Sequence, residues 1–471
     1  MKASHASAVA ALVACLAAAL CCSTGCSTYA KRVGKVRNAF YQGDLTSAAK
    51  LVDESLASGG GEADVLRLES AMIQLAGGRP REAEQSLRLV RDRFDHLEQA
   101  SLAESALATL TDDKRRAYSG EDYEKVLIRA LLAVSNLMHD GSDAEAYSLQ
   151  TIEAQERIIT GGADKSGNNP KLAYQRVALA PYLRGVLREQ THLDYDDAAR
   201  SFASVVSWRP EFLAGKLDVE RATHGHHSQP GHGVLYLFAF TGRGPFKEES
   251  AEVPTSAALL VAGEIVSAVG KQTVPPNIAP VKVPRVRSRS NSVQGVAVSV
   301  NGQPRGVTET LTDVSWMARL QCDALLTRTV ARAVARRVVK MGVIYTGKEV
   351  AGLAKNDVAN IAFDVAGIAW QATESADTRC WSLLPDKIQV LRVELPEGDH
   401  DVHLAPVSSG RQPIGRPVRQ RVRIDNGRNT YALAMFPGEK LVGQVLVSGG
   451  SVPVESNRPS SANQATWDRR E

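Results

Sequence analysis

Two stretches of similar sequence, GDLTSAAKL at residues 43–51 and GRPREAEQSL at residues 78–87, indicate how the first half of this chain folds. In each stretch a glycine is followed five residues later by an alanine, Ala48 or Ala83, and the interval from 43 to 78 is 35 residues. The same five-residue step recurs at residues 141–146. Glycine readily ends a helix, and a small alanine lets the next helix pack closely. We therefore expect a series of paired helices.

The pattern continues to the end of the first half. A fourth unit begins at Tyr182, passes an Ala-Ala pair at residues 198–199 and ends at Pro210. A period near 34 residues with this arrangement of glycine, alanine and proline resembles the tetratricopeptide repeat. The resemblance implies a solenoid whose concave surface holds peptides or partner helices. The interval from Gly78 to Gly141 is 63 residues, however, and a plain α-helical bundle is the alternative.

The second half is predicted to be rich in strands. The apolar run at residues 234–242 is bounded by glycines and predicts a buried strand. Residues 296–302 predict a strand that enters an Asn-Gly turn. Alternating apolar and polar residues predict two further strands at residues 388–395 and 400–404, and their hairpin resembles small β-sandwich modules. Residues 418–424, 430–436 and 441–447 are expected to add strands.

A helical hairpin is expected within this strand-rich half. Thr312 and Asp313 are placed to cap a helix over residues 314–340. Residues 350–373 are rich in alanine and glycine, which permits close packing against that first helix. The predicted hairpin therefore spans residues 314–373.

These patterns predict an α+β, multidomain chain with an N-terminal tetratricopeptide-like solenoid and C-terminal β-sandwich-like strands around an inserted helical hairpin. The composition, with 44% hydrophobic and 23% charged residues, is that of an ordinary globular protein and excludes a collagen, a wholly disordered chain or a multispan membrane protein. The predicted parts are a signal peptide at 1–25, a helical repeat domain at 26–215, a His-rich linker at 216–232, a mixed domain at 233–450 and a disordered tail at 451–471.

The N-terminus resembles a bacterial lipoprotein signal. Lys2 precedes an uncharged apolar run of about 17 residues from Ala6 to Cys22, which is short for a bilayer span. Cys26 follows Gly25, and lipoprotein cleavage uses a small residue before the lipidated cysteine. Ser27, rather than Asp, resembles the pattern for sorting to the outer membrane. We expect lipidation of Cys26 and a periplasm-facing protein; cleavage near residue 30 or an uncleaved anchor is the alternative.

Histidine and cysteine side chains provide two weaker hypotheses. His224, His226, His227 and His232 fall in one nine-residue stretch, where imidazoles could bind Zn²⁺ or Cu²⁺, but a solvated linker is the favoured interpretation because no Cys, Asp or Glu lies among them. Export would also place the last two cysteines, Cys322 and Cys380, in an oxidising compartment. Either they form a disulfide, or both are buried and unpaired. No cofactor is expected.

Positive charge is concentrated in two segments. Residues 281–340 hold 11 Lys/Arg and 3 Asp/Glu, a net charge of +8, and residues 405–430 hold 6 Arg and 1 Asp, a net charge of +5. Within the first segment, a stripe at four-residue spacing could meet an anion or a partner: Arg328, Arg332, Arg336 and Lys340. Export argues against nucleic acid as the ligand and favours anionic cell-wall polymer or lipid. Docking of the basic segments against the acidic remainder of the same chain is the alternative.

Three further stretches resemble an uncharacterised family of bacterial envelope lipoproteins: residues 118–128 (YSGEDYEKVLI), 311–314 (LTDV) and 376–385 (ADTRCWSLLP). The resemblance implies the same order of lipid anchor, repeat helices and mixed domain, but no established activity. In the last stretch, Asp377 is expected to pair with Arg379 or cap a turn, and Trp381 to fill the core.

The function predicted from the sequence is that of a lipid-anchored scaffold or adaptor. It would bind other envelope proteins through the helical repeats, or cell-wall polymer, without catalysis. The chain has no H-E-x-x-H motif and no G-x-S-x-G motif, and no C-x-x-C follows residue 26. The alternatives are a peptidoglycan- or carbohydrate-active enzyme without a recognisable motif and a metal-handling lipoprotein.

Overall fold

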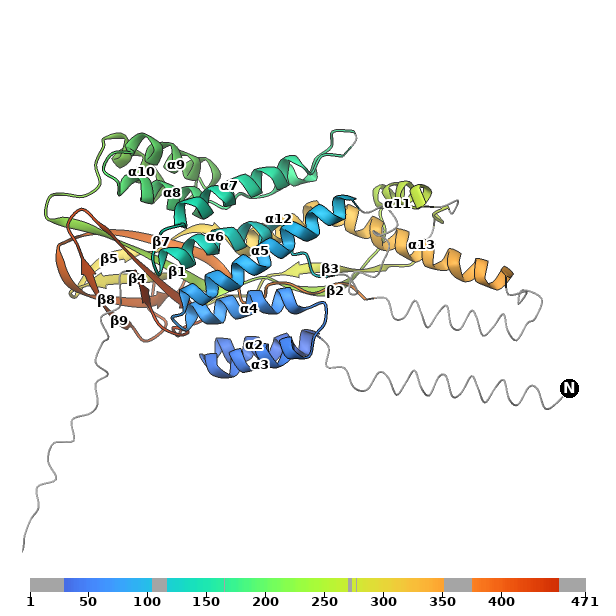
Figure 1. Ribbon diagram of the computed structural model, residues 1–471, viewed down its shortest axis with the longest axis horizontal. Helices are drawn as coiled ribbons and strands as arrows, with labels where there is room; N and C mark the ends of the chain where they lie inside the picture. The colour runs from blue at the N-terminus through green and yellow to red at the C-terminus, as the bar shows by residue number, and fades with distance from the viewer. Residues whose placement is uncertain are drawn as a thin grey trace, which may run out of the picture.

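The computed structural model describes residues 29–103, 117–164, 166–269, 273–276, 278–350 and 375–448. It is a mixed α+β structure with a helical first half and a second half built from several sheets (Figure 1). Four predictions lie outside the described residues: the signal peptide, lipidation of Cys26, the helix over residues 351–373 and the tail over residues 451–471.

The first half consists of helices that follow one another as antiparallel neighbours, and each contacts the next along the chain. Tight turns join the members of each pair. The helices are α2 (Tyr29–Tyr41), α3 (Leu45–Ala57), α4 (Ala63–Ala76), α5 (Pro80–Ala103), α6 (Asp122–Leu137), α7 (Ala144–Thr160), α8 (Leu179–Glu189), α9 (Tyr195–Trp208) and α10 (Ala214–Thr223), with a short 3₁₀ helix η2 (Pro170–Ala173) between α7 and α8.

The turn glycines predicted from the repeat have one shared geometry. Gly43, Gly78 and Gly141 have φ of 84°, 79° and 73°, in the left-handed region that favours glycine at the end of a helix. The buried alanine that follows is Ala48 or Ala83 in the first two pairs, as predicted. In the third pair Ala144 is buried and Ala146 is exposed, so the five-residue step is wrong there.

The helices form two rows that differ in burial. In α6, 14 of 16 residues are buried, whereas in α9 only four of 14 are. A helix with neighbours on nearly every side is an inner helix, and one with a single apolar stripe is an outer helix. The inner row therefore contains α4, α6 and α8, and the outer row contains α3, α5, α7 and α9.

Two larger sheets and one ribbon make up the second half. The five-stranded sheet has the order β11-β10-β1-β7-β6, the four-stranded sheet has the order β5-β4-β8-β9, and β2 pairs with β3. The strands are β1 (His232–Arg243), β2 (Phe246–Glu252), β3 (Val281–Arg287), β4 (Gly295–Val300), β5 (Gln303–Val307), β6 (Glu309–Asp313), β7 (Pro385–Pro396), β8 (Gly398–Val407), β9 (Val418–Ile424), β10 (Asn429–Phe436) and β11 (Leu446–Val447).

Strand β1 lies at the centre of the fold and is buried on both faces. Val234, Tyr236 and Phe238 join the core shared with the helices, whereas Leu235 and Leu237 join a second core shared with the four-stranded sheet. Burial on both faces explains why this strand reads as a continuous apolar run, as predicted. The chain therefore forms three layers: helices, the five-stranded sheet and the four-stranded sheet.

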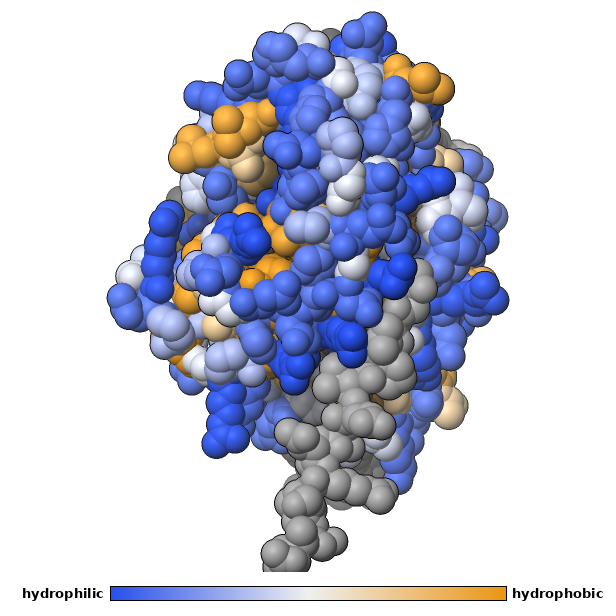
Figure 2. Space-filling model, turned by 90° about the vertical axis from the view of Figure 1, so that its left-hand side faces the viewer, coloured by the Kyte–Doolittle hydropathy of each residue, from blue (hydrophilic) through white to orange (hydrophobic). Residues whose placement is uncertain are grey.

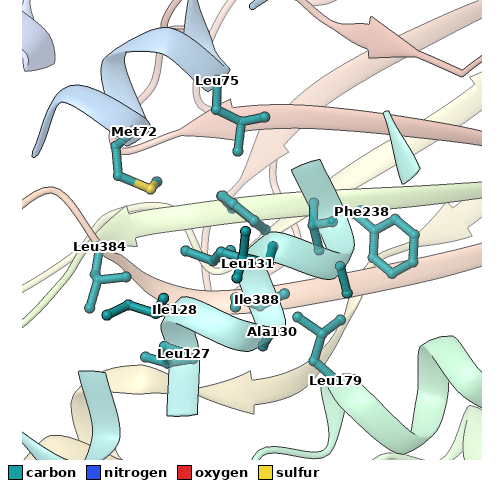
Figure 3. Close-up of a cluster of buried hydrophobic side chains, with 14 of the residues drawn as sticks. Met72, Leu75, Leu127, Ile128, Ala130, Leu131, Leu179, Phe238, Leu384 and Ile388 are labelled. Atoms are coloured by element: carbon teal, nitrogen blue, oxygen red, sulfur yellow. The ribbon is translucent and has the colours of Figure 1, made fainter. Parts of the chain in front are cut away.

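The inner helices pack directly on the five-stranded sheet. Figure 3 shows side chains of α4, α6 and α8 around those of β1 and β7. The labelled side chains are Met72, Leu75, Leu127, Ile128, Ala130, Leu131, Leu179, Phe238, Leu384 and Ile388, and all are at most 2% exposed. The surface of the inner row is consequently covered by this chain's own sheet.

A separate arm carries the Arg-rich helix. The predicted helix over residues 314–340 is interrupted at Leu325, which gives α12 (Val314–Ala324) and α13 (Leu326–Val350). Helix α13 packs against α11 (Ser256–Val269) and β3 in a third apolar cluster, away from the main body (Figure 1). Its described partner is therefore α11, which the sequence did not predict. No helix in the described ranges is long and apolar enough to cross a membrane.

The first half of the predicted linker over residues 216–232 is helical. Helix α10 continues to Thr223, and β1 begins at His232. The helix is held in place because Arg221 forms ion pairs with Glu189 of α8 and with Asp218.

Candidate functional site

The two longer stretches of the family resemblance meet in space, although 247 residues lie between them in the sequence. Residues 376–384 lie between the helices and the sheet, and Trp381 is fully buried there. Arg379 stacks over the ring of Tyr118 at 5.3 Å and forms ion pairs with Asp377, as predicted. We call residues 376–384 the connecting segment because they lead into β7.

Glu124 of α6 is the centre of one set of contacts to this segment. Its carboxylate accepts hydrogen bonds from Trp381 N at 2.7 Å, from Glu121 N at 3.0 Å and from the hydroxyls of Tyr118 and Tyr123. The side chain is fully buried, and burial raises the pKa of Glu124. Every contact of this carboxylate is with a donor of the same chain, which is the pattern of a structural anchor.

Glu69 of α4 holds the next two residues in the same way. One carboxylate oxygen accepts from Ser382 N at 2.8 Å and from Ser382 Oγ at 2.7 Å, and the other accepts from Leu383 N at 2.9 Å. Burial raises the pKa of Glu69 from 4.5 to about 7, although these hydrogen bonds oppose the shift. Two helices of the inner row therefore each contribute one buried carboxylate to the connecting segment.

Lys247 of β2 and Cys380 complete this buried cluster. Lys247 forms an ion pair with Glu121, and the carboxylates of Glu121 and Glu124 raise its pKa although burial alone would lower it. Burial and the neighbouring Glu124 raise the pKa of the Cys380 thiol to about 12. A thiol with so high a pKa is a poor nucleophile at neutral pH.

The raised pKa of Glu69 predicts a pH-dependent stability. The folded state binds a proton that the unfolded state releases between pH 4.5 and about 7, so the contribution to the free energy of unfolding is largest below pH 4.5 and is lost as pH rises through 7. The expected loss is up to about 3 kcal/mol. Urea unfolding at pH 5 and at pH 8 should show a larger decrease for wild type than for Glu69→Gln; an equal decrease in both would contradict the assignment.

A second buried network joins α8, α10 and the centre of the sheet. Arg221 donates to Glu189 at 2.7 Å and to Asp218 at 2.6 Å, and the hydroxyl of Tyr236 on β1 donates to Glu189 at 3.2 Å. Burial raises the pKa of Asp218. The network is a second link between the helices and the sheet, and no sequence pattern predicted it.

The four predicted metal-binding histidines do not converge. His227 is buried and its Nε2 lies 2.8 Å from Asn429 Oδ1, and burial lowers its pKa to about 4. His224 pairs with the carbonyl of Glu220 at 2.8 Å, while His226 and His232 are not buried. Among the residues that the structure describes, no group of three His, Cys, Asp or Glu is placed to hold a metal ion.

The disulfide hypothesis is not supported, because Cys322 and Cys380 are both free thiols. Cys322 lies on α12, with its Sγ 4.0 Å from the carbonyl of Pro284. Cys380 is buried in the cluster around Glu124. Each belongs to a different set of contacts.

The predicted Arg stripe does not form one uniform surface. Arg328 donates to the carbonyl of Gly162 at 3.3 Å and lies 3.6 Å from Asp164. Arg332 is exposed and Arg336 is half-buried, and the side chain of Lys340 is not among those that the structure describes. The neighbouring Arg337, which the stripe omitted, donates to the carbonyls of Ala279 and Pro280. Part of this positive charge is thus used within the chain.

A small hollow lies between α6, α7, the residues after η2 and α12. It is lined by Asp122, Tyr123, Val126, Gln155, Ile158, Ile159, Tyr174, Gln175, Met317 and Gln321, and its volume is about 20 Å³. That volume holds a water molecule or a methyl group rather than a metabolite. Gln175 Oε1 is buried there without a hydrogen-bond partner in the structure.

Exposed apolar and aromatic side chains occur on η2, on α12 and immediately before α10. Leu172, Leu213 and Trp316 are 73%, 65% and 43% exposed. Two tryptophans each carry a stacked guanidinium: Arg319 lies 5.0 Å from the ring of Trp316, and Arg176 lies 5.6 Å from that of Trp208. We call the set the α12 surface: Leu172, Arg176, Trp208, Leu213, Trp316 and Arg319.

The α12 surface is held together by β6 and α12. Helix α12 contacts η2, which carries Leu172. Glu309 of β6 accepts from Leu213 N at 3.1 Å, and Asp313 at the end of β6 caps α12 by accepting from Trp316 N at 2.9 Å. Tryptophan and arginine are enriched among the side chains that contribute most to protein–protein binding, whereas leucine is under-represented there.

No protein-family model, curated protein or solved structure matches the chain. The interpretation of the buried cluster and of the α12 surface therefore depends on their own contacts. The buried cluster joins layers of the fold, whereas the α12 surface is open to solvent.

Proposed function

We propose that the protein is a lipid-anchored adaptor of the bacterial envelope that binds another envelope protein through the α12 surface. The observation that carries the proposal is the exposure of Leu172, Leu213 and Trp316 around two Trp-Arg stacks. The N-terminal sequence, with Cys26 after Gly25, supports an outer-membrane anchor that would keep this surface in the periplasm.

The five-stranded sheet covers the inner helices, and this supports the α12 surface as the binding surface. A solenoid would usually offer its inner row to a peptide, but here α4, α6 and α8 pack on the five-stranded sheet. A partner must then use the outer helices or the elements beside them. The α12 surface borders α7 and α9, and it is where exposed apolar side chains gather around a rigid frame.

We also propose a specific architecture for the helix pairs and for the two larger sheets. Recurring left-handed glycines at 43, 78 and 141 favour tetratricopeptide-like units for the helix pairs. The apolar core shared by the four- and five-stranded sheets favours a β-sandwich-like module for the second half. Under this interpretation the sandwich supports the solenoid from its inner side.

Site-specific crosslinking in cells tests the adaptor. A photo-reactive amino acid in place of Trp316 or Leu172 is expected to capture one envelope protein, because both side chains lie on the proposed interface. The same amino acid in place of Leu260 on the arm, which is also 73% exposed, should capture it at least about tenfold less. Quantitative mass spectrometry of the crosslinked species measures the ratio.

Three further variants decide the outcome. Trp316→Ala should weaken co-purification of the captured protein, whereas Leu260→Ala should leave it unchanged. Cys26→Ala should reduce capture if the tether brings the two proteins together. Equal capture from positions 172, 316 and 260, or capture of glycan fragments alone, would contradict the proposal.

A further inference from the structure

The four-stranded sheet has one blocked edge and one open edge. At one edge, β5 carries Pro304, a glycine at φ 140° and an irregular register with β4. At the other, β9 contains neither proline nor glycine, and its register with β8 is unbroken over seven residue pairs. Within the described part of the chain, β9 pairs with β8 alone. Proline and bulges prevent strand addition, so only β9 is suited to it.

The backbone of β9 directs hydrogen-bonding groups outward. Two of its carbonyls accept from side chains instead of from a strand: that of Arg421 from Gln420 Nε2 at 2.9 Å, and that of Arg423 from Thr430 Oγ1 at 3.0 Å. Because successive residues of an edge strand alternate, this places the outward backbone groups on residues 419, 421 and 423. A further strand could bond to these groups.

The same three residues carry exposed arginines. The side chains of Arg419, Arg421 and Arg423 are 58%, 53% and 61% exposed and lie on one face at two-residue spacing. Arg419 and Arg421 already pair with Asp401 and Asp399 on β8, at 2.8 and 3.3 Å. Strand β8 thus shows that alternating carboxylates match this row.

Additional positive charge surrounds the edge. Three more exposed arginines flank β9 and make no ion pair with described residues: Arg411, Arg416 and Arg428. Arg419, Arg421 and Arg423 are ion-paired with three aspartates, Asp401, Asp399 and Asp425, whereas the three flanking arginines have no such match among the described residues. The end of the molecule where β8 and β9 lie is mainly hydrophilic, and its hydrophobic side chains form separate small areas (Figure 2).

We infer that β9 binds an acidic extended segment of another protein, which adds as a fifth strand to the four-stranded sheet. Backbone hydrogen bonds to the outward groups provide pairing, and carboxylates at alternate positions lie opposite the arginines. A second copy of β9 is disfavoured because like charges would face each other across the new pair. The inference uses no residue of the α12 surface and does not depend on the proposed adaptor function.

Fluorescence anisotropy with the full-length protein in detergent tests strand addition. The probe is a labelled peptide of sequence Thr-Asp-Val-Asp-Val-Asp-Thr. Saturable binding is expected, and the triple variant Arg419→Gln, Arg421→Gln, Arg423→Gln should weaken it about tenfold, since three cross-strand ion pairs are lost. The same peptide with alternate backbone nitrogens methylated keeps its charge but loses donors, and should also bind about tenfold more weakly.

A charge-matched control distinguishes binding at the β9 edge from nonspecific electrostatic attraction between the peptide and the protein. The triple variant Arg67→Gln, Arg79→Gln, Arg200→Gln removes three exposed, ion-paired arginines from the helices and should leave the affinity within about twofold. Inorganic polyphosphate is the second probe. Absence of peptide binding, equal affinity of the methylated peptide, or tighter binding of polyphosphate that survives the β9 variant would overturn the inference.

Discussion

Replacing Glu124 with alanine is expected to lower the free energy of unfolding by about 4 kcal/mol, measured by urea denaturation at pH 7. The substitution removes the acceptor of four donors, three of them buried: the backbone N–H groups of Glu121 and Trp381 and the hydroxyls of Tyr118 and Tyr123. It also leaves Lys247 with one carboxylate fewer nearby. Removing a buried charge recovers some desolvation energy, which is why the loss is smaller than the sum of the lost contacts.

Glu54→Ala is the matched control for this prediction. Its side chain is 60% exposed and lies 3.9 Å from Lys50 on the same helix, so the change should be below about 0.5 kcal/mol. The loss of unfolding free energy for Glu124→Gln should lie between those of the two variants, because the amide oxygen still accepts hydrogen bonds whereas the amide NH₂ would face other donors. A loss below about 1 kcal/mol for Glu124→Ala would mean that water replaces the carboxylate.

A double-mutant cycle with Glu69→Ala tests whether both carboxylates hold one element. Glu124 bonds to residue 381 and Glu69 to residues 382 and 383. Once either carboxylate is removed, the connecting segment is partly released, and the remaining carboxylate then contributes less to the free energy of unfolding. The double variant should therefore lose at least about 1 kcal/mol less than the sum of the single variants. Additive losses would show that the anchors act independently.

Local sequence signals predicted much of the secondary structure. The glycine-bounded run in β1, the Asn-Gly turn after β4 and the alternation in β7 to β10 each depend on residues close together in the chain. The helix pairs followed from glycines at fixed spacing. These signals describe the elements but not their neighbours in space.

Long-range pairings could not be predicted in this way. Strand β1 lies parallel to β10, with Val234 opposite Asn429, and no pattern in either strand identifies the other. The packing of α13 on α11 has no sequence signature, whereas the small residues of the segment 350–373 predict a hairpin partner close in the chain. Hydrophobic periodicity states which face of an element is buried, but not against what.

The sequence contains one local indication of the buried cluster, which is the position of one of its carboxylates in its helix. Glu69 occurs in the largely apolar helix sequence LRLESAMIQL, whereas Glu124 lies in the polar first turn of α6, where it forms a capping box with Glu121. A carboxylate at an otherwise apolar helical position requires donors from elsewhere in the fold. Such a position identifies Glu69 as an anchor before the structure is known, although only the structure identifies residues 382 and 383 as its partners.

Gly443→Ala is expected to cost about 4 kcal/mol in unfolding free energy. Gly443 has φ 75°, and an added Cβ would lie 1.9 Å from the carbonyl oxygen of Ala76 at the end of α4. That carbonyl accepts a hydrogen bond from Gln444 N at 3.1 Å, so the clash would also break the contact. The loss comes from left-handed backbone strain, from displacement of the backbone and from one hydrogen bond.

Two other glycines separate these contributions. Gly438 has no positive φ and open space around it, so Gly438→Ala should change the free energy by less than about 0.5 kcal/mol. Gly141 has φ 73° and open space, so Gly141→Ala reports strain alone, about 1 to 2 kcal/mol. If Gly443→Ala costs no more than Gly141→Ala, residues 437–448 can move off α4 without penalty. A larger loss, with faster proteolysis of residues 437–448, means that the segment after β10 joins the sheet to the end of α4 as an integral part of the fold.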